Sequence, residues 1–159
     1  KSAEDHDVWW VEEPIYPADR YDVMGKTRGL TSVKIAAGEN LGNLTDVRWM
    51  LGAGGVDIVQ PSVAKIGGIG ETIKAMDLAL EAGIEAIPHS PFVGPALAAT
   101  IHIIASRDED LICENRFCDL EANLLGASLV ASGGEFEVGD APGFGFDVDE
   151  RSIERYRVR

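Results

Sequence analysis

The chain has 159 residues, of which 27 are acidic and 14 are Lys or Arg, so its formal net charge at pH 7 is −13. An apolar share of 45% is ordinary for a globular protein and excludes a disordered or fibrous chain. No apolar run approaches the ~20 residues of a membrane-spanning helix, and so negative a surface repels phosphate backbones and acidic lipid. We therefore expect neither nucleic-acid nor membrane partners.

The two cysteines, Cys113 and Cys118, are too few for a framework of disulfides. Free thiols are the ordinary state of such residues in a reducing compartment. No basic segment precedes an apolar stretch in the manner of a signal peptide. We therefore expect a cytoplasmic protein.

In chain order, the sequence repeats a short β-branched run, a polar or Gly/Pro stop, and a helical stretch. The predicted strands lie at 8–11, 33–37, 56–60, 84–88 and 111–113, and the predicted helices at 19–30, 44–51, 69–82, 95–106 and 149–156. The runs are nearly continuous in apolar residues, as expected for parallel strands covered on both faces. We expect an α/β fold with about five parallel strands, either an open doubly wound sheet or a (β/α) barrel. The three tryptophans, Trp9, Trp10 and Trp49, are most simply interpreted as packing residues.

After Glu114 the pattern changes, and the stretch 120–145 is rich in glycine and small residues. We interpret 119–159 as a C-terminal wrap that belongs to the same domain as the barrel portion at 1–118. Five strand–helix units of about 25 residues do not close an eight-stranded barrel, which takes ~250 residues. On the barrel interpretation, the chain is the C-terminal part of a longer protein.

A polar residue follows each predicted strand, and these residues are Glu12 or Glu13, then Glu39, Ser62, His89 and Glu114. Counted from Glu12, the steps between them are 27, 23, 27 and 25 residues. One polar group per strand–helix period, always at the same end, places them on one face, where both architectures keep their active sites. The alternative is that acidic residues simply begin solvated loops.

Two of these residues suggest a metal ion. Carboxylates from neighbouring strands, such as Glu12 and Glu39, do not lie together unpaired, because like charges raise one pKa or require a cation. Oxygen ligands favour Mg²⁺, which usually takes more protein oxygen than two carboxylates supply in a tight site. We therefore expect a third ligand outside this pair.

The motifs WWVEEP, IAAGEN, DIVQPSVAKIGGI and IPHSPF, in this order, resemble the enolase superfamily, in its mandelate racemase/muconate lactonizing enzyme-like, acid-sugar dehydratase branch. The likeness runs over 8–114, and the tail GDAPGFGFDVDERSIERY resembles that family's C-terminal ending. It implies a TIM-type (β/α)7β barrel of which this chain supplies strands four to eight, without the capping domain and the first three strands. It also implies a Mg²⁺ cofactor, a small sugar-acid substrate and a homo-oligomer for the full-length protein.

The resemblance further implies a role for each matching residue. Glu12 and Glu39 would be the second and third Mg²⁺ ligands. His89 would be the catalytic acid/base, and Glu114 the acid that hydrogen-bonds the substrate carboxylate as it becomes an enolate. Lys65, in the KIGG element, would support the site. The first metal ligand, an aspartate, and any lysine base on strand two would lie upstream of this chain.

One departure from the family pattern concerns Ser62, where mandelate racemase-like members place an aspartate that orients the histidine. A carboxylate there would raise the basicity of His89 and fix its tautomer, whereas a serine can hydrogen-bond but adds no charge. Three interpretations stay open. His89 acts mainly as an acid, or the principal base lies on the upstream half, or catalysis has been lost.

The implied reaction removes a proton α to a carboxylate, which requires electrostatic stabilisation of the enolate by Mg²⁺. Loss of a β-hydroxyl then gives dehydration, which we favour, while return of the proton gives racemisation or epimerisation, and lactone cycloisomerisation uses the same chemistry. Two other classes remain as alternatives. One is a phosphate- or nucleotide-binding α/β domain that uses the glycines of GGIG, and the other is a truncated or decayed barrel half without catalysis. We expect no turnover from this chain alone.

Overall fold

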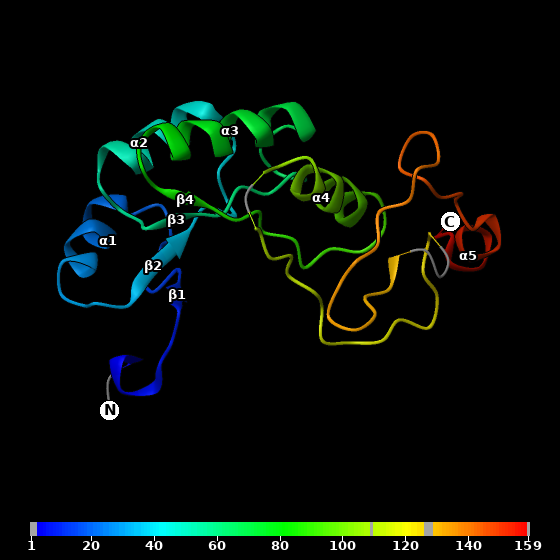
Figure 1. Cartoon of the computed structure of the whole chain (residues 1–159), viewed down its shortest axis with the longest axis horizontal. Helices are drawn as coiled ribbons and strands as arrows, with labels where there is room; N and C mark the ends of the chain where they lie inside the picture. The colour runs from blue at the N-terminus through cyan, green and yellow to red at the C-terminus, as the bar shows by residue number, and fades with distance from the viewer. Residues whose placement is uncertain (1–2, 109, 126–128, 159) are drawn as a thin grey trace. The chain divides into compact units, whose positions relative to one another are not determined.

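Figure 1 shows the computed structural model, which describes residues 3–108, 110–125 and 129–158. The chain divides into two compact units, Lys1–His89 and Ser90–Arg159. Among the described residues, no helix combines the length and the apolar character that crossing a bilayer requires.

The first unit alternates strands and helices, which confirms the predicted α/β pattern. Its elements are a 3₁₀ helix η1 (Ala3–His6), β1 (Trp10–Glu12), α1 (Tyr21–Arg28), β2 (Lys34–Ala37), α2 (Leu44–Gly52), β3 (Ile58–Val59), α3 (Ile69–Glu81) and β4 (Glu85–Ala86). The four strands form one parallel sheet in the order β1-β2-β3-β4. Neighbours in the sheet are therefore also neighbours in sequence, as in the wall of a (β/α) barrel, whereas the order of a doubly wound sheet reverses.

The strand register brings the carboxyl ends of the strands to one edge of the sheet. Glu12 is in register with Ala36, and Val59 is in register with both Ala37 and Ala86. Ala36 and Ala37 are consecutive and fully buried, so both faces of β2 are covered. This agrees with the apolar runs of the sequence, which are typical of parallel strands buried on both sides.

The helices of this unit begin and pack as their sequences dictate. α2 begins after Asn43, whose side-chain oxygen accepts hydrogen bonds from the N–H groups of Thr45 and Asp46 and so caps the helix. In Figure 1, α2 and α3 lie side by side over the same face of the sheet. The buried residues of α3 recur every three or four positions and form one face: Thr72, Ala75, Met76 and Ala79.

The 3₁₀ helix η1 is an element that the sequence did not predict. The Glu4 carboxylate accepts hydrogen bonds from the Thr31 hydroxyl and from the N–H and hydroxyl of Ser32. These contacts tie η1 to the loop before β2. A single 3₁₀ turn is too short to leave a hydrophobic period in the sequence.

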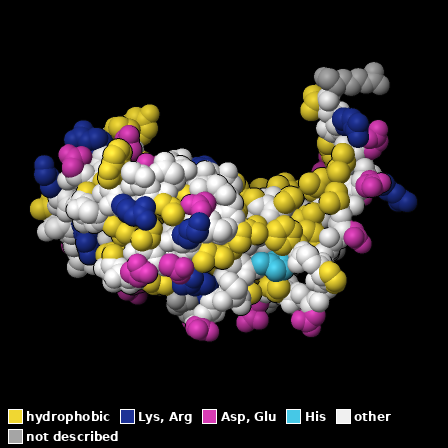
Figure 2. Space-filling model, turned by 90° about the horizontal axis from the view of Figure 1, so that it is seen from above, with side chains coloured by type: hydrophobic (Ala, Val, Ile, Leu, Met, Phe, Trp, Pro, Cys, Tyr) yellow, Lys and Arg dark blue, Asp and Glu magenta, His cyan; other side chains and the backbone are white. Residues whose placement is uncertain are grey.

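The prediction that the tryptophans are packing residues is wrong for two of the three. Trp9 is 54% exposed and Trp49 is 68% exposed. Trp49 lies on α2 between the buried Val47 and Met50, and its position on the helix turns it away from the sheet. Figure 2 likewise shows apolar side chains that reach the surface among charged ones.

The second unit contains α4 (Pro95–Ala105) and α5 (Glu150–Tyr156). Three residues of α4, together with two from the loops that follow, form its buried cluster: Leu97, Ala98, Ile101, Leu125 and Leu129. Apart from an isolated bridge between Ser132 and Glu135, the described part of this unit contains no strand.

The fifth predicted strand, at 111–113, is therefore wrong. Ile112 is 44% exposed. Ser90 contacts the end of this segment through side-chain groups, since its hydroxyl donates to the backbone oxygen of Glu114 and its N–H donates to the Glu114 carboxylate, each at 3.2 Å. These bonds stand where a strand would make backbone hydrogen bonds to a neighbouring strand. A run of three apolar residues forms a strand only where a neighbouring strand offers such hydrogen bonds.

Candidate metal centre

Three titratable side chains converge at the carboxyl edge of the sheet. Glu12 is the last residue of β1, Glu39 follows β2, and His89 follows β4. One carboxylate oxygen from each glutamate and one ring nitrogen of His89 all lie within 4.8 Å of one another. The spacing of one polar group per strand–helix period predicted this convergence, because parallel strands end at the same edge.

The imidazole of His89 lies between the two carboxylates. Its Nε2 is 3.3 Å from Glu39 Oε2, and its Nδ1 is 3.8 Å from Glu12 Oε1. The His89 side chain is 9% exposed, and its backbone N–H donates to the Pro61 oxygen at 3.2 Å. This backbone bond continues the pairing of β3 with β4 and fixes where the ring enters the site.

A glycine allows Glu39 to approach the end of β3. Gly38 has a φ of 131°, a backbone conformation that L side chains rarely adopt. A Cβ at this position would lie 3.0 Å from the Gln60 nitrogen. The GEN motif therefore begins with glycine because the chain turns directly against β3 before it presents Glu39.

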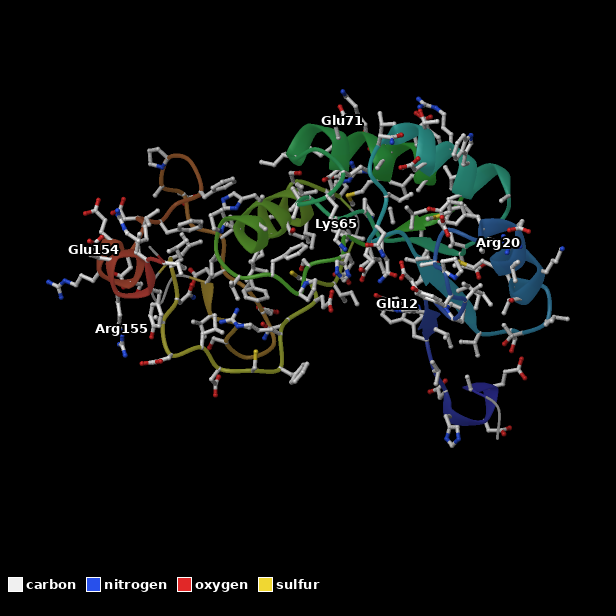
Figure 3. All side chains as sticks on the ribbon, turned by 180° about the vertical axis from the view of Figure 1, so that it is seen from behind. Glu12, Arg20, Lys65, Glu71, Glu154 and Arg155 are labelled. Carbon is white, nitrogen blue, oxygen red and sulfur yellow. The ribbon has the colours of Figure 1, made fainter. Side chains whose placement is uncertain are left out.

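Two side chains from the segment after β3 hold the glutamates. Gln60 Nε2 donates to Glu12 Oε2 at 2.9 Å. Lys65 Nζ donates to Glu39 Oε1 at 3.0 Å and to Asn40 Oδ1 at 2.9 Å. Figure 3 shows Glu12 at the end of β1 and Lys65 in the segment between β3 and α3. The sequence placed Lys65 beside the site as a supporting residue but gave no role to Gln60.

Ser62 lies in the same segment and is fully buried. Its hydroxyl oxygen makes no hydrogen bond within the described part of the chain. The hydrogen bond by which a serine could orient His89 is therefore not formed in this structure. Burial without a charge or a hydrogen bond makes Ser62 a weak substitute for the aspartate of the family pattern.

The pKa shifts of two glutamates, Glu39 and Glu13, show which charges surround the site. Burial raises the pKa of the Glu39 carboxyl, but the hydrogen bond from Lys65 and the positive charges of His89 and Lys65 outweigh it and hold this pKa below its ordinary value. Burial also raises the pKa of Glu13, and the charges of Glu39 and Glu12 raise it further, against a backbone hydrogen bond from Gly38. Three carboxylates thus share this region with Lys65 and His89, and a bound cation would offset their negative charge further.

The donor set fits a divalent cation. Two carboxylate oxygens and a ring nitrogen face one point, and Glu13 adds negative charge nearby. Oxygen ligands are those that Mg²⁺ prefers. Glu13 itself has a φ of 40°, a conformation uncommon outside glycine, so the chain turns sharply straight after Glu12.

Glu114 belongs to the second unit, where its carboxylate accepts the hydrogen bond from Ser90. Cys113 beside it lies 3.3 Å from the Ser90 hydroxyl through its sulfur, and burial raises the pKa of this thiol. The role of Glu114 as the acid that binds the substrate carboxylate stays a prediction.

The family model described as "Enolase C-terminal domain-like" matches residues 1–152. The chain belongs to this family, which confirms the resemblance carried by its motifs. It is 30% identical over 157 residues to the D-xylonate dehydratase of Haloferax volcanii, and the match covers 98% of this chain and 38% of that protein.

Solved structures of the same superfamily share the fold. A mandelate racemase/muconate lactonizing protein from Paracoccus denitrificans, complexed with magnesium, matches with a TM-score of 0.86 and 28% identity, over 96% of this chain and 41% of that one. The 3,6-anhydro-D-galactonate cycloisomerase of Zobellia galactanivorans matches with a TM-score of 0.79 and 30% identity, over 97% of this chain and 44% of that one. The chain thus spans less than half the length of each protein that it matches here.

Proposed function

We propose that the chain supplies part of the active site of a Mg²⁺-dependent enzyme that dehydrates a sugar acid. The observation that carries this proposal is the convergence of Glu12, Glu39 and His89 within 4.8 Å. Similarity to a D-xylonate dehydratase and to a magnesium-bound structure of the family supports the reaction class and the metal.

In this proposal Glu12 and Glu39 hold the ion. Bound there, Mg²⁺ supplies positive charge that stabilises the negative charge developing on the substrate when the α proton leaves. The two carboxylates fix the position of that charge, and Lys65 keeps Glu39 ionised through its hydrogen bond.

His89 moves a proton in the second half of the reaction. Its Nε2 faces the same point as the glutamate oxygens, so a substrate at the ion meets this nitrogen. Ser62 brings no charge and makes no hydrogen bond within the described residues, so it does not orient the ring for a role as base. We therefore assign His89 the role of acid, which protonates the departing β-hydroxyl, and place the base that removes the α proton outside this chain.

Cycloisomerisation of a lactone is the second candidate. It uses the same ion and the same removal of an α proton, and the 28% identity over 159 residues to the D-galactarolactone cycloisomerase of Agrobacterium fabrum favours it specifically. Binding of phosphate at the GGIG turn is disfavoured, because Glu71 places a carboxylate in the first turn of α3, where it pairs with Lys74 at 2.7 Å. An anion at that helix end would meet this negative charge.

Titration of this chain with Mn²⁺, followed by electron paramagnetic resonance, tests the metal site. We expect bound Mn²⁺ that Mg²⁺ displaces, and loss of this binding in Glu12→Gln and in Glu39→Gln. Glu71→Gln is the matched control, since it removes the charge of a half-buried glutamate on α3 in the same unit and should leave binding unchanged. Binding that persists in both site variants would contradict the proposal.

The placement of the base outside this chain has its own test. A sugar acid incubated with the chain and Mg²⁺ should give no dehydrated product, because the proposed base lies outside the chain. Product formed by the chain alone would show that every group needed for turnover is already present.

A further inference from the structure

We propose that Gln60 and Lys65 are positioning residues, each of which occupies one oxygen of a metal-binding glutamate and leaves the other oxygen for the ion. The inference rests on the proposed function, because it concerns the same two glutamates. In this inference, the segment 60–65 after β3 orients the carboxylates of Glu12, at the end of β1, and Glu39, which follows β2.

Gln60 is well placed to hold Glu12. It follows β3 directly and is only 5% exposed, while the Glu12 side chain is 39% exposed. An exposed glutamate keeps several rotamers unless a partner fixes it. The Gln60 amide donates to Oε2 at 2.9 Å, and the remaining oxygen, Oε1, is the one that faces His89.

Lys65 holds Glu39 in the corresponding way. Its ammonium donates to Oε1, and the other oxygen, Oε2, lies 3.3 Å from His89 Nε2. A second bond to Asn40 fixes the ammonium from the residue beside Glu39. Both carboxylates therefore have one oxygen bound by the segment 60–65 and one oxygen turned to the shared point.

This arrangement has a consequence for the kind of ion. Mg²⁺ and Mn²⁺ accept one oxygen from each carboxylate, whereas Ca²⁺ readily takes both oxygens of a carboxylate. A glutamate with one oxygen already bonded offers only the first mode. The two positioning residues should therefore favour the smaller ions over Ca²⁺.

The first test measures the Mn²⁺ affinity of Gln60→Leu, which keeps the volume and charge of the side chain but removes the amide. We expect the affinity to fall about tenfold, the usual lower range for losing a group that orients a ligand. Thr72→Val is the control, because Thr72 is a fully buried residue of α3 whose hydroxyl bonds Gly68, at 2.9 Å. If Gln60→Leu binds Mn²⁺ as tightly as Thr72→Val does, Gln60 does not position Glu12. Circular dichroism of each variant checks that it folds.

The second test compares Ca²⁺ with Mg²⁺ as competitors of Mn²⁺ in Lys65→Met. Removal of a positive charge alone would strengthen the binding of all three ions by a similar factor. Release of Glu39 should instead raise the affinity for Ca²⁺ more than that for Mg²⁺, and Lys65→Arg, which keeps a charged donor, should restore most of the discrimination. Lys74→Met removes a comparable lysine from an exposed ion pair with Glu71 and should change neither ratio. An unchanged Ca²⁺ to Mg²⁺ ratio in Lys65→Met would overturn the role of Lys65.

The outcomes separate this inference from the proposed function. If the unchanged chain binds no Mn²⁺, or if Glu12→Gln and Glu39→Gln bind it normally, both proposals fail. If those two variants lose the ion while Gln60→Leu and Lys65→Met behave as their controls, the metal site stands and only the positioning roles fail.

Discussion

The two units of the chain carry site residues in different ways. In Lys1–His89, the glutamates and the histidine stand at the ends of strands that pair in one parallel sheet. In Ser90–Arg159, Glu114 stands in a segment that forms no strand, and the described bond to its carboxylate comes from Ser90. The comparison shows that residues at regular sequence spacing come together in space when they stand at the ends of paired parallel strands, because hydrogen bonds to the neighbouring strand fix where each strand ends. Outside a sheet, regular spacing does not fix where a side chain lies.

Hydrogen exchange should show the largest difference between the two units. The amides of Asp57 and Gln60 donate to β2 at 2.8 Å inside the sheet, while the segment 111–113 has no ladder. We expect these two amides, which flank β3, to exchange on the order of 100-fold more slowly than those of 111–113. Equal protection of the two segments would mean that 111–113 pairs as a strand after all, and the contrast between the units would disappear.

Core substitutions should destabilise both units strongly. Ile58 in β3 is fully buried and Leu125 in the second unit is 1% exposed. Truncation of either to alanine should lower the free energy of unfolding by about 3 kcal/mol, through lost transfer energy and the cavity left behind. Urea denaturation measures both. A much smaller loss for Leu125→Ala would show that the cluster of the second unit is loosely packed and would sharpen the comparison.

Asp57 should matter more than an ordinary charged residue. One of its carboxylate oxygens accepts from Arg28 Nε at 2.6 Å, and the other accepts from the Ile35 N–H at 2.9 Å. Asp57→Ala leaves that strand amide unpaired and should cost about 2 kcal/mol of unfolding free energy. Lys74→Met, which breaks an exposed ion pair, should cost at most about 0.5 kcal/mol in the same assay. Equal effects of the two would show that the Asp57 contacts do not stabilise the sheet.

Much of this could be predicted from the sequence, for physical reasons. The run before Glu39 became a strand that is buried on both faces, and the half-buried run before Glu12 pairs with it in register, so their ends met. The fold contradicted the prediction at 111–113, where three apolar residues found no ladder. The contacts of Gln60 with Glu12 could not be predicted, because they join side chains 48 residues apart and depend on the register of three strands.

The smallest effect concerns the pH dependence of stability near Glu13. Its pKa in the folded protein is raised by burial and by Glu39, so ionised Glu13 weakens the fold. The stability that a raised carboxyl contributes is full below its unfolded pKa and is lost as the pH rises through its folded pKa. Glu13→Gln, which still accepts a hydrogen bond from Gly38, should therefore raise the melting temperature at pH 7 and leave it unchanged near pH 3. A variant that melts lower than the parent at pH 7 would contradict this sign.

The central claim is that Glu12 and Glu39 hold one ion beside the ring of His89, and the ring resonances of the three histidines in the NMR spectrum test it most directly. Substoichiometric Mn²⁺ broadens the signals of nuclei close to the bound ion. The account predicts that the His89 ring broadens first, and that this broadening disappears in Glu12→Gln and in Glu39→Gln. Mn²⁺ that binds tightly while the His89 ring stays sharp would contradict it.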